Sequence, residues 1–276
     1  MRQMSILTDV TKCIGCEECV KACKETNKTG EDQPWRWQRK IDDLSATRWT
    51  TILPRPDRHY VRKQCRHCLE PACASVCPVG AMHKTPEGPV VYNSKICMGC
   101  RYCMMACPYG IPRYTWADAV PYVRKCIMCY DKISSGELEQ PACTKACPKE
   151  ATIYGEREEL IRLAHGRIEE NPDLYIPKVF GEHEVGGTSV LYLSDIDLGF
   201  LGWKEDLGDE PLPMKTWVVL NKVPGIFVGV GVTMFGLYWI IDRRMRLQEE
   251  ALEKKSASTD AQHDPETGTD KVEAKK

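Results

Sequence analysis

The sequence predicts an α+β fold made of two small cysteine-rich modules, followed by one C-terminal transmembrane helix. Three observations lead to this prediction. All sixteen cysteines of the 276-residue chain fall between Cys13 and Cys147. They form four runs of similar spacing, and short apolar segments with strand character lie beside these runs. In the other half of the chain, Val223–Ile241 contains no charged residue.

The first expected elements surround the first cysteine run. Ser5–Val10 reads as a short strand that leads into a binding loop, and Val20–Lys28 reads as a short helix after it. Residues 30–60 then form an insertion that contains Pro54 and Pro56. We expect its tryptophans to pack against the cysteine-rich body or a partner rather than to stack on a ligand. These tryptophans are Trp35, Trp37 and Trp49.

The cysteine runs carry the chemistry of the sequence. They are Cys13-x2-Cys16-x2-Cys19-x3-Cys23, Cys65-x2-Cys68-x4-Cys73-x3-Cys77-Pro78, Cys97-x2-Cys100-x2-Cys103-x3-Cys107-Pro108 and Cys126-x2-Cys129-x13-Cys143-x3-Cys147-Pro148. The third has the C-x2-C-x2-C-x3-C-P spacing with which bacterial ferredoxins bind cubane iron–sulfur clusters. In such a run three thiolates bind one cluster and the fourth cysteine binds another. Four runs therefore predict two bacterial-ferredoxin-like modules with four [4Fe-4S] sites.

Further elements lie between and after the runs. Pro89–Tyr92 and Ala151–Tyr154 are expected as short hairpin strands beside the binding loops. Arg157–Ile168 has the apolar spacing of an amphipathic helix. Residues 175–213 are mixed in character, with a small apolar patch at Val190–Leu193.

The stretch Val223–Ile241 predicts a transmembrane helix, because at about 1.5 Å per residue it spans the hydrocarbon core of a bilayer. Trp217, Tyr238 and Trp239 fit an aromatic belt at the membrane interface. The alternative, a buried core helix, fits poorly with so uniform a stretch near the end of a soluble domain. The tail Leu247–Lys276 is charged and without periodicity, so we expect it to be disordered beyond one or two helical turns.

Disulfides and zinc are the other uses that many cysteines suggest. A disulfide framework is disfavoured because many neighbouring cysteines are only two residues apart. Structural zinc sites usually take two ligands from each of two separated pairs. Here two runs have a third cysteine two residues beyond a pair, and all four runs close with x3-Cys. This spacing favours a cubane over a single ion.

Other chemistries lack sequence support. No G-x-G-x-x-G motif follows a strand and no P-loop is present, so nicotinamide and nucleotide binding are not indicated. The formal charge is −1, and each oxidised cubane with four thiolates would add about −2. Arg101, Arg124 and Lys125 therefore indicate charge compensation rather than nucleic-acid binding. No histidine pair has metal spacing, which favours structural or surface roles. The histidines are His59, His67, His83, His165, His183 and His263.

The run order and spacers, over residues from about 5 to 242, resemble those of the four-cluster ferredoxin-like subunits of bacterial respiratory oxidoreductases. In that family the first run pairs with the fourth, and the second with the third. The ligand sets that the resemblance implies are set 1, Cys13, Cys16, Cys19 and Cys147; set 2, Cys23, Cys126, Cys129 and Cys143; set 3, Cys65, Cys68, Cys73 and Cys107; and set 4, Cys77, Cys97, Cys100 and Cys103. Some relatives have tryptophan where this chain has Cys100 and bind a three-iron cluster, so four cubanes are expected here.

Two features narrow the resemblance. Gly186–Tyr192 resembles the stretch before the anchor in the membrane-anchored formate dehydrogenase iron–sulfur subunit and in the hydrogenase-associated ferredoxin-like protein, and both share the single C-terminal helix. Met1–Lys12 has no apolar h-region and no twin arginine, so no signal peptide is expected. This favours the formate dehydrogenase subunit, which is exported with its catalytic partner.

The resemblance implies an electron-transfer subunit that is not an enzyme on its own. It would relay single electrons between a catalytic subunit, of formate dehydrogenase or hydrogenase type, and a multi-spanning membrane subunit that binds quinone or haem b. Another molybdopterin- or quinone-linked respiratory complex is an alternative, and a zinc-stapled membrane scaffold is an alternative of another class. A self-contained reductase would need an open coordination site or second cofactor, but four cubanes use all sixteen cysteines.

These expectations give a division of the chain and a location. Module A comprises 1–62 with 120–175 (runs one and four), module B comprises 63–119, a linker 176–216, the membrane helix 217–242 and the tail 243–276. We expect a single-pass protein of the bacterial inner membrane. The basic residues after the helix place the tail in the cytoplasm and the cluster-bearing body in the periplasm, with the opposite topology as the alternative. These residues are Arg243, Arg244, Arg246, Lys254 and Lys255.

Overall fold

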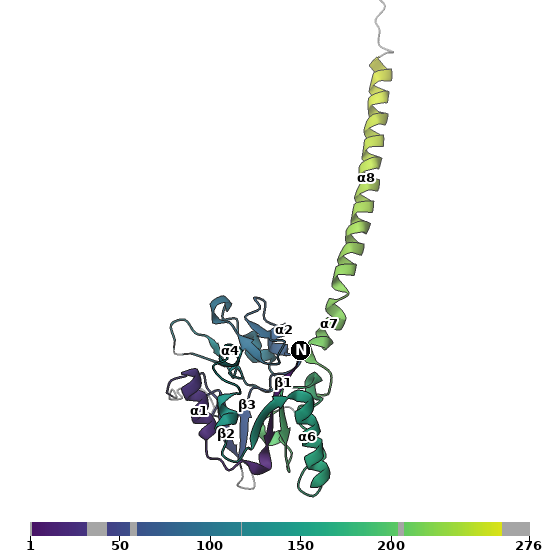
Figure 1. Cartoon of the computed structure of the whole chain (residues 1–276). Helices are drawn as coiled ribbons and strands as arrows, with labels where there is room; N and C mark the ends of the chain where they lie inside the picture. The colour runs from purple at the N-terminus through teal and green to yellow at the C-terminus, as the bar shows by residue number, and fades with distance from the viewer. Residues whose placement is uncertain (1, 32–42, 56–59, 117, 204–206, 261–276) are drawn as a thin grey trace, which may run out of the picture. The chain divides into compact units, whose positions relative to one another are not determined.

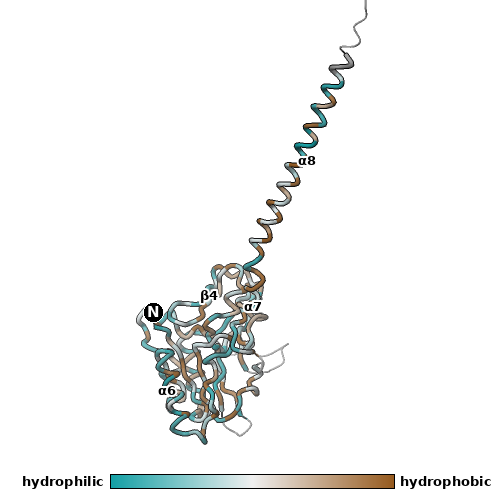
Figure 2. The backbone as a smooth tube through the Cα atoms, turned by 90° about the vertical axis from the view of Figure 1, so that its right-hand side faces the viewer, coloured by the Kyte–Doolittle hydropathy of each residue, from teal (hydrophilic) through white to brown (hydrophobic). Residues whose placement is uncertain are grey.

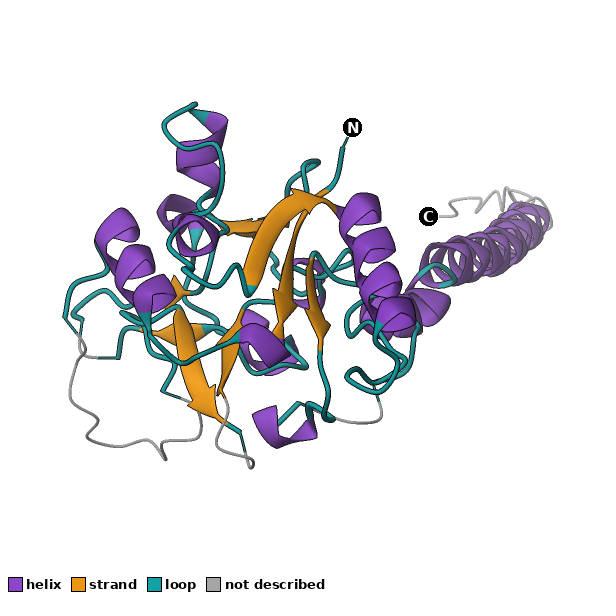
Figure 3. Ribbon diagram, turned by 60° about the horizontal axis from the view of Figure 1, so that its bottom comes forward, coloured by secondary structure: helices purple, strands orange, loops and turns teal. Residues whose placement is uncertain are grey.

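A computed structural model describes residues 2–31, 43–55, 60–116, 118–203 and 207–260. The chain divides into two compact units, Met1–Thr216 and Trp217–Lys276. All sixteen cysteines lie in the first unit. Figure 3 shows the strands of this unit with short helices and loops around them.

A three-stranded sheet organises the first unit. Its central strand β1 (Met4–Asp9) pairs antiparallel with β8 (Thr152–Glu156) and parallel with β9 (Val190–Leu193). Successive side chains of β1 point to opposite faces, so Leu7 and Ile6 enter different hydrophobic clusters. Leu7 packs under helix α6 (Arg157–Glu170), which runs beside the sheet in Figure 1. Ile6 faces the side that carries the cysteine loops, where its cluster includes Met128 of the fourth run.

The remaining elements of the unit are short, and most of them flank cysteines. Three hairpins are β2 (Thr50–Pro54) with β3 (Tyr60–Gln64), β4 (Met82–Lys84) with β5 (Val90–Tyr92), and β6 (Arg113–Tyr114) with β7 (Val123–Arg124). The helices are α1 (Glu18–Asn27), α2 (Ala72–Ser75), α3 (Tyr102–Ala106), α4 (Tyr130–Ser134) and α5 (Ala142–Lys145). Single 3₁₀ turns are η1 (Val10–Lys12), η2 (Ser94–Ile96), η3 (Glu184–Gly186) and η4 (Gly199–Leu201).

The predicted α+β class is confirmed, as are the strands at β1, β5 and β8 and the helix at α6. The β2–β3 hairpin was not predicted, because residues 30–60 were expected to form an insertion. Trp49, just before β2, packs against the hydrophobic cluster that contains Cys65 and Cys126, as expected. Trp35, Trp37 and Pro56 lie outside the described residues.

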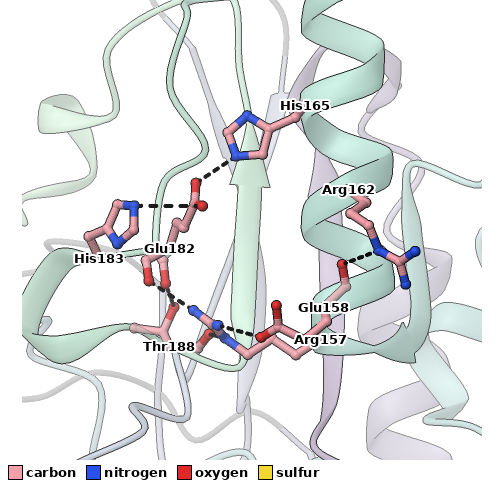
Figure 4. A network of polar contacts seen from close by, with 8 residues as sticks. Arg157, Glu158, Arg162, His165, Glu182, His183 and Thr188 are labelled. Atoms are coloured by element: carbon pink, nitrogen blue, oxygen red, sulfur yellow. Dashed lines mark hydrogen bonds and ion pairs between the residues drawn. The ribbon is translucent and has the colours of Figure 1, made fainter.

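A polar network fixes the loop that leads into β9 (Figure 4). Arg157 donates from Nε to the carbonyl of Thr188 at 3.0 Å and from Nη2 to the carbonyl of Glu182 at 2.8 Å. The carboxylate of Glu182 lies 2.9 Å from Nε2 of His165 on α6. A Cβ on Gly187 would stand 2.8 Å from the Glu182 carbonyl oxygen, so this turn requires glycine. The segment 182–188 is therefore held to α6 by side-chain contacts.

The C-terminal part of the chain is helical. Helix α7 (Leu212–Leu220) ends shortly before α8 (Val223–Asp260), which has Pro224 in its first turn, where proline is tolerated. Within the described residues, one helical stretch, Leu212–Ser256, is long and apolar enough to cross a membrane. Figure 2 shows the apolar part of α8 followed by a mixed, more hydrophilic part.

The helix extends further than the sequence predicts. Disorder was expected soon after Leu247, but α8 continues to Asp260, so that prediction was wrong for this stretch. Good helix formers such as Glu, Lys, Ala and Leu fill it, and Arg246 forms an i,i+4 ion pair with Asp242 at 2.6 Å. Local propensity therefore sustains a helix here without any apolar periodicity. Residues 261–276 lie outside the described residues.

Candidate metal centres

The four cysteine runs fold into the same local loop. In each C-x2-C pair, the residue just before the second cysteine has a positive φ. The four values are 73° at Gly15, 48° at His67, 74° at Gly99 and 57° at Met128. This turn directs a backbone N–H at the first cysteine: the N–H groups of Gly99 and Met128 donate to the sulfurs of Cys97 and Cys126 at 3.4 and 3.3 Å. The repeat seen in sequence is thus also a repeat of backbone conformation.

Glycine at the first of these turns has a steric reason as well. A Cβ added to Gly15 would stand 2.5 Å from the ring of Tyr60 on β3. The Gly15 N–H also lowers the pKa of the Cys13 thiol, against the larger raising effect of burial. The loop of the first run and the β2–β3 hairpin are therefore fitted closely to each other.

Runs one and three share a second pattern. Each begins after a 3₁₀ turn whose cap side chain, Asp9 or Asn93, accepts an N–H two residues on, at 3.2 and 3.0 Å. Each then enters its helix, α1 or α3, through a left-handed residue, Glu17 or Arg101. These two runs are structural repeats of each other.

Runs two and four share a different pattern. Their third cysteines, Cys73 and Cys143, lie on the short helices α2 and α5, which follow Pro71 and Pro141. Both helices end shortly before the last cysteine of the run. The long spacer of run four is occupied in part by α4. The two patterns therefore alternate along the chain, so that each run of the first pattern is followed by a run of the second.

The cysteines of set 1 line one cavity. Cys13, Cys16 and Cys19 from the first run share its wall with Cys147 from the fourth. Cys16 is exposed and Cys19 is buried. Burial, together with the charges of the neighbouring Cys143, Cys13 and Cys147, raises the pKa of the Cys19 thiol to about 11, although Arg62 opposes this shift. The fold therefore brings together residues that are far apart in sequence.

All four cysteines of set 2 are buried. Burial and the charges of Cys143 and Cys129 raise the pKa of the Cys23 thiol to about 12. Asn27 at the end of α1 points its amide at this group, since Nδ2 lies 3.6 Å from the sulfur of Cys23 and 4.0 Å from that of Cys129. Set 2 is the most enclosed of the four sets.

Sets 3 and 4 are more open. Burial and the charges of Cys65 and Cys107 raise the pKa of the Cys68 thiol to about 12, and burial is the main cause of the raised pKa of Cys73. In set 4, burial and the charges of Cys100, Cys77 and Cys97 raise the pKa of the Cys103 thiol to about 11. All four cysteines of set 4 are partly exposed.

Neighbouring sets adjoin one another in the order 1, 2, 3, 4. Cys19 of set 1 packs in the same hydrophobic cluster as Cys143 of set 2, and Cys126 of set 2 packs in another cluster with Cys65 of set 3. Cys73 of set 3 packs in the same small hydrophobic cluster as Cys77 and Cys103 of set 4. The sets therefore form a continuous series through the first unit.

The donor chemistry of each set fits a cubane cluster. Four cysteine thiolates are the ligands that a [4Fe–4S] cluster takes, and backbone N–H groups point at several of the sulfurs, among them those of Cys97 and Cys126. A cubane holds its four ligand sulfurs apart at separate corners, whereas a zinc ion needs all four around one point. In the described part of the chain, no three His, Cys, Asp or Glu side chains converge as they would on a metal ion.

The three basic residues expected to compensate charge make different contacts. Lys125 is buried, donates from Nζ to the carbonyl of Cys126 at 2.9 Å, and acts to lower the pKa of Cys73. This position fits the predicted role of Lys125 in compensating the negative charge of a cluster. Arg101 and Arg124 lie over aromatic rings. The guanidinium carbon of Arg101 is 5.5 Å from the centre of the Tyr114 ring, and Arg124 lies over the ring of Tyr122.

Three polar residues near the sulfurs were not predicted from the sequence. They are Asn27, Arg62 and Lys84, and Lys84 donates to the carbonyl of Cys68 at 2.9 Å. Arg62 stands between Val61 and Lys63 and before Gln64, so no signal in the sequence set it apart from its polar neighbours. His67 is buried and accepts the Val90 N–H at Nδ1, which agrees with the structural role expected for it.

Comparison with known proteins places the chain in a family. The model of the 4Fe-4S dicluster domain matches residues 56–157, which contain runs two, three and four. A protein of Nitratidesulfovibrio vulgaris is 40% identical over 94% of this chain and 73% of its own length. The hydrogenase-2 operon protein HybA of Escherichia coli O157:H7 is 35% identical over 70% of each chain.

The chain belongs to this 4Fe-4S dicluster family. The B subunit of the anaerobic dimethyl sulfoxide reductase of Escherichia coli K12 is a further relative, 36% identical over 60% of this chain and 79% of its own length. Family membership makes the chain an iron–sulfur electron-transfer subunit of an oxidoreductase complex, and its sixteen cysteines are consistent with four [4Fe-4S] clusters. These relatives do not single out a formate dehydrogenase subunit.

Proposed function

We propose that this subunit relays single electrons through four [4Fe-4S] clusters, held by sets 1 to 4, between a catalytic subunit and a membrane subunit that binds quinone or haem b. The observation that carries the proposal is the continuous series of the sets, because cysteines of each set pack in one cluster with cysteines of the next. The division of cysteines among the sets is part of the proposal. It is supported by the cavity that Cys147 shares with the first run.

We propose a hydrogenase or a formate dehydrogenase as the catalytic partner. The likeness to a hydrogenase-2 operon protein supports the first. The likeness of the segment Gly186–Tyr192 to the stretch before the formate dehydrogenase anchor supports the second. The proposed membrane partner is multi-spanning, and the long apolar helix Leu212–Ser256 supports an anchor in the bacterial inner membrane.

The test uses anaerobic membranes that contain the chain with its native partners. We expect either hydrogen or formate to produce the paramagnetic signals of reduced clusters, and a quinone to remove them. A strain that lacks this chain supplies the control, because its membranes should retain oxidation of the substrate by an artificial dye but lose quinone reduction. Quinone reduction at the normal rate without the chain would contradict the relay.

A further inference from the structure

Arg62 on β3 is a buried cation that donates to neutral groups. Its side chain is 2% exposed. Its hydrogen bonds go to neutral oxygens: Nε to Thr50 Oγ1 at 2.9 Å, Nη1 to Thr152 Oγ1 at 3.0 Å, and Nη2 to Gln64 Oε1. Within the ranges that the structure describes, no Asp or Glu forms an ion pair with it. The guanidinium is thus held in one position by three neutral groups.

Other arginines in this unit have a carboxylate partner, and Arg55 and Arg167 have theirs at less than 3 Å. Arg55, which is buried, lies 2.8 Å from Asp195, and Arg167, which is more open, lies 2.9 Å from Asp9. A buried charge is normally paired, because removing it from water is costly. Arg62 therefore requires negative charge from another source.

The cysteine sets supply that charge. Arg62 lies in the wall of the cavity that contains all of set 1. Arg62 stands directly opposite Ile52 of β2, and Ile52 packs in one hydrophobic cluster with Cys19 of set 1 and Cys143 of set 2. Residues directly opposite each other in an antiparallel pair share a face of the sheet, so Arg62 lies beside set 2 as well. Burial alone would lower the pKa of Arg62 itself, but Cys143, Cys19 and Cys126 raise it above its ordinary value. Arg62 thus faces both sets from one fixed position.

We propose that Arg62 is a shared counter-ion of sets 1 and 2, which raises the reduction potentials of both clusters above the values that the same sites would have without a cation. The proposal rests on the proposed function, because it assumes a cluster in each set. A cubane with four thiolates carries about −2 when oxidised and about −3 when reduced. A fixed positive charge stabilises the second state more than the first. Arg62 is therefore a positioning and tuning residue and not a ligand.

Set 2 has the greatest need of such a charge. All four of its cysteines are buried, and burial disfavours additional negative charge. Asn27 contributes N–H donors but no charge. Sets 3 and 4 lie beyond set 2 in the series, and the cations near set 3 are the half-buried Lys84 and the buried Lys125. Loss of Arg62 should therefore affect the first two clusters selectively.

The first test compares Arg62→Gln with Arg62→Lys in the purified complex, by redox titration of the four cluster signals. In Arg62→Gln we expect the ratio of reduced to oxidised cluster at a fixed potential to fall about tenfold for sets 1 and 2, a shift of about 59 mV to more negative potential. Arg62→Lys keeps the charge and should stay closer to the native values. The signal of set 1 is identified by its loss or change in Cys16→Ser.

A second variant tests the charge without removing the guanidinium. Gln64 is buried, accepts from Arg62, and its Nε2 has no hydrogen-bond partner in the described part of the chain. Gln64→Glu therefore keeps the size and the acceptor, and it places a carboxylate against Arg62. We expect the same direction of shift for sets 1 and 2. This variant decides the question if Arg62→Gln fails to take up clusters.

The matched control is Arg55→Gln with Asp195→Asn, which removes a buried arginine together with its own carboxylate. It should leave all four potentials unchanged. The proposal is overturned if iron-loaded Arg62→Gln or Gln64→Glu leaves sets 1 and 2 at native potentials, or if all four clusters shift equally. Fewer than four clusters in the native complex would instead contradict the proposed function.

Discussion

At the scale of the residue, the repeated turn in the cysteine loops depends on backbone conformation more than on residue type. Glycine occupies it in runs one and three, but His67 and Met128 adopt the same left-handed region in runs two and four. A non-glycine residue in this left-handed region carries a strain energy of about 1 kcal/mol. That strain is offset by the surroundings, since His67 and Met128 are both buried. Glycine marks the turn in the sequences of runs one and three, and no residue type marks it in runs two and four.

Cys100→Ser tests the assignment of one ligand. Cys100 is partly exposed and lies near Cys103. Loss of one thiolate should convert the set 4 cluster to a three-iron form or remove it. We expect iron to fall from about sixteen to between about twelve and fifteen per chain, with three cubanes left. Chemical analysis and electron paramagnetic resonance of the anaerobic protein measure this, and loss of all four clusters would contradict separate sites.

Arg157→Met tests the network of Figure 4. The change leaves the carbonyls of Glu182 and Thr188 without their charged donor. We expect a loss of about 3 kcal/mol in stability, seen as an apparent melting temperature lower by roughly 5–10 °C. Arg162→Met, on the exposed side of α6, is the control and should change little. Equal stability of the two variants would show that the Arg157 contacts contribute nothing.

At the scale of the element, the sequence predicted best where one signal dominated. The cysteine spacing located all four loops, whereas Val190–Leu193, which the sequence showed only as an apolar patch, forms the buried strand β9. The β2–β3 hairpin was missed because most of its buried residues are polar: Thr50 and Arg62, for example, bond to each other instead of adding to an apolar face. Hydrophobic periodicity cannot detect such a strand, because the burial of its polar residues depends on partners that lie elsewhere in the fold.

The glycines of α8 test the proposed membrane partner. Gly225 and Gly229 are four residues apart, and small residues at this spacing let membrane helices approach closely. We expect Gly225→Leu with Gly229→Leu to release the membrane subunit during purification in detergent while the iron content stays unchanged. Val230→Leu with Met234→Leu is the control, because at 3.6 residues per turn these two positions lie on the opposite face of α8 from the glycines. A complex that survives the first change would show that the helix only tethers the chain.

At the scale of the whole molecule, all cysteines lie in one compact unit, and the apolar stretch lies largely in the other. The sequence could predict this division because cysteine content and hydropathy both change sharply along the chain. It could not predict the continuous series of sets, which depends on contacts between runs far apart in sequence. The assignment of modules A and B remains a prediction, as does the exact ligand division.

The metal content of the intact protein tests the number of sites. Anaerobically purified chain should contain about sixteen irons and about sixteen acid-labile sulfides, from four clusters of four. The protein should be brown, with broad absorbance in the visible. Iron near eight, or zinc as the main metal, would contradict four cubanes.

Topology is the second prediction at this scale. Five basic residues follow Ile241 within fifteen positions, and positive charge favours the cytoplasmic side of a membrane. We expect the tail inside and the cluster-bearing unit in the periplasm. Protease added to spheroplasts should digest that unit and spare a tag at Lys276. Digestion of the tag beside a protected unit would establish the opposite orientation.

The central position of β1 has a consequence for synthesis of the chain. Of the three strands in its sheet, β1 leaves the ribosome first, and it gains its neighbours only when β8 and β9 have been made. At about 5–20 residues per second, translation of this interval takes on the order of ten seconds or more. Throughout that time the thiols of Cys13, Cys16, Cys19 and Cys23 follow an unpaired strand, and Cys147 has yet to join them. The nascent chain must therefore keep its earliest cysteines reduced and away from premature metal until nearly the whole first unit has been translated.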